Sequence, residues 1–179
     1  MSIDVLLSEG KKLNDEDKYE EAVICYDKAI KIDPKNAEAW RGKGESLAMI
    51  SAKKAMICFD RLIELKPADV RAWAWKEMLS RLLGRYEEAI ACSDRLIELK
   101  PEVGRPWTRK GYALSKLERY EEAIACFDKA IEMKYEVADS WMNKGIVFDR
   151  SGNAEEATTC FGKATELDPT DSYEWTVKG

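Results

Sequence analysis

The chain has 179 residues, no histidine and a formal net charge of −5. This negative balance disfavours nucleic acid and anionic membranes as partners, and no apolar run approaches the roughly 18 residues of a membrane-spanning helix. The first residues, Met1-Ser2-Ile3-Asp4, lack the basic start and apolar core of a secretory signal. We therefore expect a cytoplasmic protein that binds neither nucleic acid nor membranes.

Two residue types recur along the chain with one fixed period. Tryptophan occurs at Trp40, Trp73, Trp107, Trp141 and Trp175, and cysteine at Cys25, Cys58, Cys92, Cys126 and Cys160, with gaps of 33, 34, 34 and 34 residues between the cysteines. A fixed period near 34 residues is typical of stacked-repeat proteins. Equivalent atoms of packed helices lie about 10 Å apart, whereas a disulfide needs Cα atoms within about 7 Å. The thiols are therefore predicted to be free and buried.

The period divides the chain into repeat units. With each tryptophan at the fourth position, we expect a single domain, 1–179, whose units are 3–36, 37–69, 70–103, 104–137 and 138–171, with a partial unit at 172–179. The second unit is one residue short, in the turn around Ser51. Each unit is expected to contact mainly its neighbours.

Each unit is predicted to form two helices. In the fourth unit, Trp107 and Leu114 lie at helical spacing in a first helix, and Ala123, Phe127 and Ile131 do so in a second. In most units a proline ends the second helix before the next tryptophan. These prolines are Pro34, Pro67, Pro101 and Pro169, and the fourth unit has Tyr135 in that place.

This pattern resembles the tetratricopeptide repeat family. The residues that carry the resemblance are the pairs Trp40 and Gly44, Trp107 and Gly111, and Trp141 and Gly145, then Ala22, Ala55, Ala89, Ala123 and Ala157, and the aromatic residues Tyr26, Phe59, Phe127 and Phe161. The resemblance covers nearly the whole chain. It implies an all-α fold, a right-handed solenoid of antiparallel helix pairs, and a non-enzymatic protein-interaction scaffold.

The third unit departs most from the pattern. Glu77 stands where other units have glycine, Ser80 replaces a large apolar residue and Ser93 replaces the aromatic residue. Because such exchanges redistribute side-chain volume, we predict an altered helix crossing in this unit and a local change in curvature.

The chain offers little for catalysis or for cofactor binding. Without histidine it lacks the commonest general base and the usual zinc nitrogen ligand, and it has no Cys-x-x-Cys pair. Paired glutamates such as Glu121-Glu122 are interpreted as residues of the first helical turn. We expect no enzyme, no cofactor and no metal site.

Lysine and aspartate also recur with the period. The lysines are Lys43, Lys76, Lys110, Lys144 and Lys178, and the aspartates are Asp27, Asp60, Asp94 and Asp128. One interpretation is a series of ion pairs within or between units; the other is a lysine track for polyanions. The first is favoured because the acids share the period of the bases.

The family resemblance implies ligand binding on the concave face, at set positions of the first helices. The residues predicted to form the peptide-binding site are Arg41, Arg71, Trp75, Met78, Arg105, Arg109, Tyr112 and Asn143. Arginine pairs bidentately with carboxylates, and tryptophan and tyrosine are frequent binding anchors. The expected partner is a protein or peptide segment with acidic and apolar side chains. For Trp75 two roles stay open, in the groove or packed against a neighbouring helix.

Two alternatives to a peptide-binding scaffold follow from the carboxyl end. The partial sixth unit carries Trp175 and Val177, and these could stack on a second copy in self-association. The chain could also be the targeting part of a larger enzyme or signalling protein.

Overall fold

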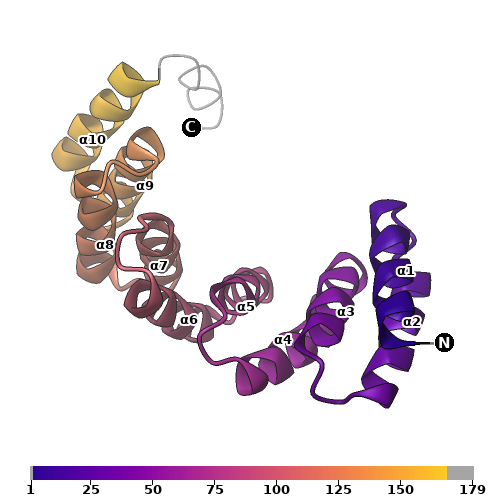
Figure 1. Ribbon diagram of the computed structural model, residues 1–179. Coiled ribbons are helices and arrows are strands. Elements are labelled where there is room, and N and C mark those ends of the chain that lie inside the picture. Colours follow the sequence, from indigo (N-terminus) through magenta and orange to yellow (C-terminus); the bar gives the residue numbers. More distant parts are fainter. Residues whose placement is uncertain (1, 169–179) are drawn as a thin grey trace. The chain divides into compact units, whose positions relative to one another are not determined.

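The computed structural model describes residues 2–168, which form ten α-helices and no strand (Figure 1). In chain order the helices are α1 (Ile3–Asp15), α2 (Tyr19–Ile32), α3 (Ala37–Ile50), α4 (Ala52–Leu65), α5 (Val70–Leu82), α6 (Tyr86–Leu99), α7 (Arg105–Lys116), α8 (Tyr120–Glu132), α9 (Val137–Arg150) and α10 (Ala154–Leu167). The all-α prediction is confirmed.

The chain divides into two compact units, unit 1 up to Cys92 and unit 2 from Ser93 onward. In unit 1, helices α1 to α5 pack in chain order, each against the next, and α1 also contacts α3. In unit 2, helices α7 to α10 do the same, and α7 contacts α9. Within each unit this is the nearest-neighbour stacking expected of a solenoid.

The turn inside most helix pairs depends on one residue in the left-handed region. Asp17, Gly84, Glu118 and Gly152 have φ values of 59°, 72°, 59° and 85°. The following amide donates back across the end of the first helix, as when Arg119 N–H bonds the Leu114 carbonyl at 3.0 Å. This is how many helices end. In the short second repeat that residue is missing, and Ser51 alone separates α3 from α4.

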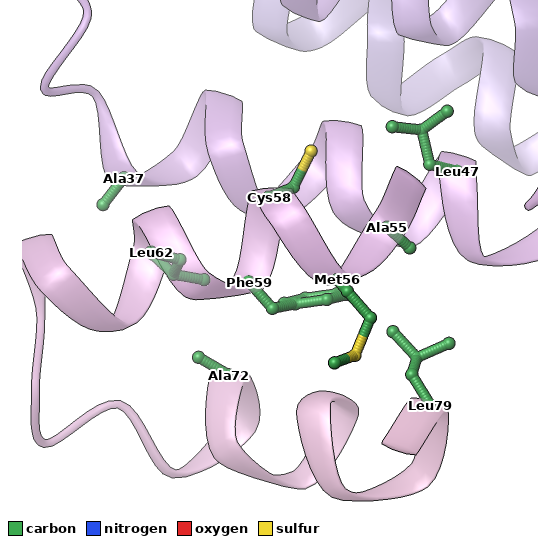
Figure 2. Packing of buried hydrophobic residues seen from close by; sticks show 9 residues of the cluster. All are labelled: Ala37, Leu47, Ala55, Met56, Cys58, Phe59, Leu62, Ala72 and Leu79. Atoms are coloured by element: carbon green, nitrogen blue, oxygen red, sulfur yellow. The ribbon is translucent and has the colours of Figure 1, made fainter. Parts of the chain in front are cut away.

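The best-defined core of unit 1 lies between α3, α4 and α5 (Figure 2). Figure 2 shows Met56 and Phe59 of α4 pointing toward the helix that carries Ala72 and Leu79. Phe59 is fully buried and Leu79 is 1% exposed. Burying side chains of this size contributes about 1.5–3 kcal/mol each, so this cluster anchors α5 to the repeat before it.

Glycine recurs in the first helices because an aromatic ring from the second helix lies on it. A Cβ atom on Gly44 would lie 2.9 Å from Phe59 Cζ, and one on Gly111 would lie 2.8 Å from Phe127 Cε1. Such separations are shorter than carbon atoms tolerate. Only glycine therefore allows the ring to approach the first helix so closely.

The third repeat replaces this glycine with a buried charge. Glu77 of α5 is fully buried, and its Oε1 lies 3.4 Å from Nε of Arg81 one turn later. Ser80, in the same helix, is also fully buried. A carboxylate can be buried at tolerable cost only when it is paired, so Arg81 has a structural role here. The altered helix crossing stays a prediction.

All five cysteines are free and buried, as predicted. Burial raises the pKa of Cys58 to about 11 and that of Cys92 to about 12. Since the thiolate is the reactive form, the raised pKa values favour the less reactive thiol at Cys58 and Cys92 near neutral pH.

Candidate protein-interaction surface

The periodic lysines form ion pairs with the periodic aspartates. In each of the four periodic lysines within residues 2–168, Nζ lies close to the aspartate Oδ1 that precedes it by 16 residues: 2.6 Å for Lys43–Asp27, Lys76–Asp60 and Lys110–Asp94, and 2.5 Å for Lys144–Asp128. Lys178 lies outside the described residues. We call these four pairs the lysine–aspartate ladder. It links the second helix of one repeat to the first helix of the next. The ion-pair interpretation is confirmed.

Arg41, the first residue of the predicted site, is held by Asp69. Its Nη2 donates to Asp69 Oδ2, and the other oxygen of that carboxylate accepts from the Ala72 amide at the start of α5. Burial by itself would raise the pKa of Asp69, but the hydrogen bonds from Ala72 and Arg41 outweigh it, so the pKa lies below its ordinary value. Arg41 therefore joins α3 to the start of α5.

Arg71 is in a different situation from Arg41. Its side chain is 70% exposed, and its Nη2 lies 3.2 Å from Oε1 of Glu45. An exposed ion pair of this kind is worth about 0–1 kcal/mol. A carboxylate brought by a partner could replace Glu45 at little cost.

Trp75 packs against the core on one side. Its ring stacks on Phe59 with a centroid separation of 5.6 Å and an interplanar angle of 9°. Trp75 and Met78 both pack against the cluster shown in Figure 2 and stay half-buried. The packing role considered for Trp75 is therefore observed, and because the residue is only half-buried, part of its side chain stays accessible.

In unit 2, Tyr135 positions Arg105. Arg105 Nε donates to the Tyr135 hydroxyl at 2.6 Å, and its guanidinium carbon lies 5.8 Å from the centre of the ring. Tyr135 in turn donates to Glu136 and packs so tightly on Gly104 that a Cβ there would lie 2.3 Å from its own Cβ. Cation–π contacts and hydrogen bonds of this kind orient an arginine.

The sequence marked Tyr135 only as an exception to the closing prolines. No local signal showed that it would lie against Arg105, because 30 residues separate them. The missing proline is the one sequence feature that distinguishes this loop from the others.

The other predicted residues of unit 2 lie on α7 and α9. Arg109 and Tyr112 are half-buried on α7, one turn apart, and the Lys116 ammonium lies 5.2 Å from the Tyr112 ring centre. Asn143 is half-buried on α9, which contacts α7. The structure thus places Arg105, Arg109 and Tyr112 on one helix.

The eight predicted residues are divided equally between the two units. Arg41, Arg71, Trp75 and Met78 lie in unit 1, and Arg105, Arg109, Tyr112 and Asn143 lie in unit 2. Trp175 and Val177, the residues considered for self-association, lie outside the described residues 2–168.

A cleft between α7 and α8 was not predicted. Its volume is about 380 Å³, and its walls are Trp107, Lys110, Leu114, Glu122, Ala125, Cys126 and Lys129. Its lysines and glutamate already form ion pairs with Asp94, Glu132 and Arg119. What is left to contact a ligand is mainly apolar.

Within residues 2–168, no group of three or more His, Cys, Asp or Glu side chains could hold a metal ion. None of the helices in that range is both long and apolar enough to cross a membrane.

Models of one repeat family match most of the chain. Residues 10–50 match a model described as TPR repeat, and residues 105–134, and also 70–103 and 138–171, match models described as tetratricopeptide repeat. No curated protein sequence matches significantly.

Solved structures with the same fold include MamA and YrrB. A MamA structure has a TM-score of 0.88 at 20% identity, covering 96% of this chain and 94% of that one. MamA from residue 41 to its end, from Desulfovibrio magneticus RS-1, has a TM-score of 0.86 at 19% identity, covering 95% and 97%. YrrB, described as a TPR protein with an unusual peptide-binding site, has a TM-score of 0.84 at 21% identity, covering 97% and 90%. Together with the matched repeats, these likenesses show that the chain belongs to the tetratricopeptide repeat family.

Proposed function

We propose that this chain is a non-catalytic scaffold that binds a protein or peptide segment carrying acidic and apolar side chains. The observation that carries the proposal is the presentation of Arg105. Its exposed guanidinium is oriented by the ring and hydroxyl of Tyr135, and it forms no ion pair with any residue in 2–168. A preoriented arginine fork is suited to a carboxylate.

The surroundings of Arg105 support a mixed acidic and apolar ligand. Arg109 and Tyr112 follow on the same helix, and tyrosine and arginine are the residue types that most often dominate binding energy. YrrB, a solved structure with this fold, is described as having a peptide-binding site. A polypeptide is therefore the class of partner that we propose.

Unit 1 offers a second contact region of similar chemistry. Arg71 is exposed and, among the described residues, pairs only with Glu45 at 3.2 Å, and the half-buried Trp75 and Met78 lie on the same helix. Arg41, which Asp69 holds, is assigned a smaller part in binding.

The proposal can be tested with a peptide library displayed on phage. Peptides selected on the immobilised protein should be enriched in Asp or Glu next to apolar residues. The Arg105→Glu variant should bind a selected peptide at least about tenfold more weakly, a loss of about 1.4 kcal/mol. Tyr135→Phe keeps the ring but removes the hydroxyl, and should weaken binding by a smaller factor because Arg105 loses its acceptor.

Arg95→Glu is the matched control. Arg95 lies in α6 and forms an exposed ion pair with Glu98 three residues later. The Arg95→Glu variant introduces the same change of charge on a different helix from Arg105, so it should leave the affinity nearly unchanged. Equal losses in Arg95→Glu and Arg105→Glu, or selected peptides without acidic residues, would show that this surface is not the binding site.

A further inference from the structure

The side chain of Tyr26 in α2 passes between glycines of two first helices. Cβ atoms on Gly10 of α1 and Gly42 of α3 would lie 2.8 Å and 2.3 Å from Tyr26 Cζ. The Tyr26 hydroxyl oxygen would lie 2.7 Å from the Cβ on Gly42. Tyr26 is only 4% exposed, and its hydroxyl therefore ends directly over Gly42.

Packing alone does not require this hydroxyl. At the same repeat position Phe59, Phe127 and Phe161 pack their rings on a glycine without any hydroxyl. The Tyr26 hydroxyl makes no hydrogen bond with another residue in the described part of the chain, and it is not among the fully buried polar atoms that lack a partner, so its oxygen is reachable from solvent. The first repeat therefore carries a polar group that the fold does not use.

Carboxylates lie on both sides of that hydroxyl. Glu38, Gly42 and Glu45 follow one face of α3 at i, i+4 and i+7. A hydroxyl over Gly42 thus lies between the two glutamates. Burial in the first place, and then the negative charges of Glu45, Glu38 and Asp15, raise the pKa of Tyr26 to about 12. The hydroxyl keeps its proton at any physiological pH.

Asp15 is brought to the same place by contacts between α1 and α3. The Ser46 hydroxyl of α3 donates to Asn14 Oδ1 at 2.7 Å, and Asp15 is the next residue and the last of α1. Helices α1 and α3 also contact each other directly. Three carboxylates from two helices are therefore close enough to raise the pKa of the Tyr26 hydroxyl.

These carboxylates are not neutralised within unit 1. Glu38 and Asp15 are exposed and form no ion pair with a described residue. Lys11, on α1, forms none with them either. Glu45 has only the exposed Arg71, at 3.2 Å. Negative charge therefore exceeds positive charge around Tyr26.

We propose that Tyr26, Glu38, Glu45 and Asp15 form a binding site for a cation, namely the ammonium or guanidinium group of a lysine or arginine in a partner polypeptide. The hydroxyl oxygen accepts an N–H of the cation, and the carboxylates accept charge-assisted hydrogen bonds from the others. The site lies in the first two repeats and does not depend on the surface around Arg105. A partner that uses both would need a basic residue as well as acidic ones.

The test uses the whole protein with its tyrosine rings labelled with carbon-13. An oligolysine peptide with both ends capped is titrated in while the ring signals are followed by NMR, and Tyr26→Phe identifies the Tyr26 signal. We expect a saturable shift of that signal. Capped oligoarginine should act likewise, with the relative affinities showing which cation is preferred, and capped oligoglutamate should cause no shift. A Tyr26 signal that none of the peptides shifts would overturn the proposal.

Three variants decide whether the binding belongs to this site. Glu38→Gln and Tyr26→Phe should each weaken oligolysine binding about three- to fivefold, the range of a partly exposed charged contact. Glu20→Gln removes one exposed carboxylate from the first turn of α2 and should change the affinity little. Equal losses in Glu38→Gln and Glu20→Gln would show non-specific attraction and overturn the proposal.

Two further results test the proposed cation-binding site. Tyr26→Phe should fold normally, since phenylalanine occupies that position in three repeats, and circular dichroism checks this. If this variant bound oligolysine as well as the unchanged protein does, the hydroxyl would have no part and the proposal would be wrong. Arg105→Glu should leave oligolysine binding unchanged, so failure of the acidic-peptide proposal can be told apart from failure of this one.

Discussion

At the scale of single residues, two of the recurring tryptophans each make a hydrogen bond to the loop that precedes them. The indole N–H of Trp40 donates to the Pro34 carbonyl and that of Trp73 to the Pro67 carbonyl, both at 2.9 Å. In these two repeats the bond ties the start of the first helix to the loop before it. In these two repeats the six-residue spacing therefore places the indole N–H against the carbonyl of the proline.

Glycine substitutions should reveal which glycines the packing requires. Gly111→Ala places a Cβ 2.8 Å from the Phe127 ring, so we expect it to lower the free energy of unfolding by about 1–3 kcal/mol through overpacking. Gly162 lies in α10 and has no atom within 4 Å of its Cβ position. Gly162→Ala should therefore raise stability by up to about 1 kcal/mol through helix propensity.

Urea unfolding of the two variants provides the comparison, because each differs from the unchanged chain by one methyl group in a helix of unit 2. A Gly111→Ala variant as stable as Gly162→Ala would contradict the close approach of Phe127.

At the scale of helices and turns, the left-handed turn residues offer a direct test. Glu118 adopts φ 59° although it is not glycine, whereas Gly84 and Gly152 occupy the same place in their repeats. A side chain in this region costs about 1–2 kcal/mol, partly offset by the lower flexibility of the unfolded chain. Glu118→Gly should therefore raise the free energy of unfolding by about 0.5–1 kcal/mol.

The reverse change serves as the control. Gly84→Ala places a Cβ in the same left-handed conformation and should destabilise the chain by about 1 kcal/mol. Thermal unfolding followed by circular dichroism is sufficient to measure both. If both variants lost stability, the turn would depend on the Glu118 side chain rather than on backbone conformation.

Between neighbouring helices, the lysine–aspartate ladder should give measurable coupling. Lys110 and Asp94 lie 2.6 Å apart with side chains 22% and 47% exposed. A double-mutant cycle of Lys110→Met and Asp94→Ala should yield a coupling of about 0.3–1 kcal/mol, since partial burial preserves some of the Coulomb attraction.

Arg95 and Glu98 form the comparison pair, with side chains 40% and 63% exposed in a single helix. Their coupling should be smaller and should vanish sooner as salt is added. If the coupling energy of Lys110 and Asp94 were below that of Arg95 and Glu98, the lysine–aspartate ladder would specify the register of neighbouring helices without stabilising their packing.

At the scale of the whole molecule, the buried cysteines predict loss of stability in alkali. The folded-state pKa is about 11 for Cys58 and Cys126 and about 12 for Cys92, all above the ordinary 9.0. The unfolded chain therefore releases these protons first. The stabilisation is complete below pH 9 and is lost as the pH rises through the folded values, with a slope of about 1.4 kcal/mol per pH unit for each thiol.

Urea unfolding at a series of pH values above 9 measures this slope. The double variant Cys58→Ala, Cys126→Ala should show a shallower decline than the unchanged chain, because two of the titrating groups are absent. An unchanged slope would show that the decline has another source, such as the Lys76 ammonium, whose pKa is raised by Asp60 and Glu88 against the effect of burial.

Much of this architecture could be predicted from the sequence because stacked repeats depend on local and nearest-neighbour interactions. The period specifies helix pairs, buried free thiols and the partnership of lysine with aspartate, since each of these recurs in register. Equivalent residues in successive repeats meet equivalent surroundings, and comparison of the repeats with one another is enough to recognise them.

Only the tertiary structure decided the contacts that do not recur. Asp69 pairs with Arg41, Phe59 stacks on Trp75, Tyr135 accepts a hydrogen bond from Arg105, and the Tyr26 ring packs on Gly10 and Gly42. Each of these contacts depends on a side chain from another helix that differs from repeat to repeat. The repeat pattern therefore does not predict the contact. The arginines could therefore be identified in the sequence, but whether each one pairs with a carboxylate of its own chain depends on packing between non-equivalent positions.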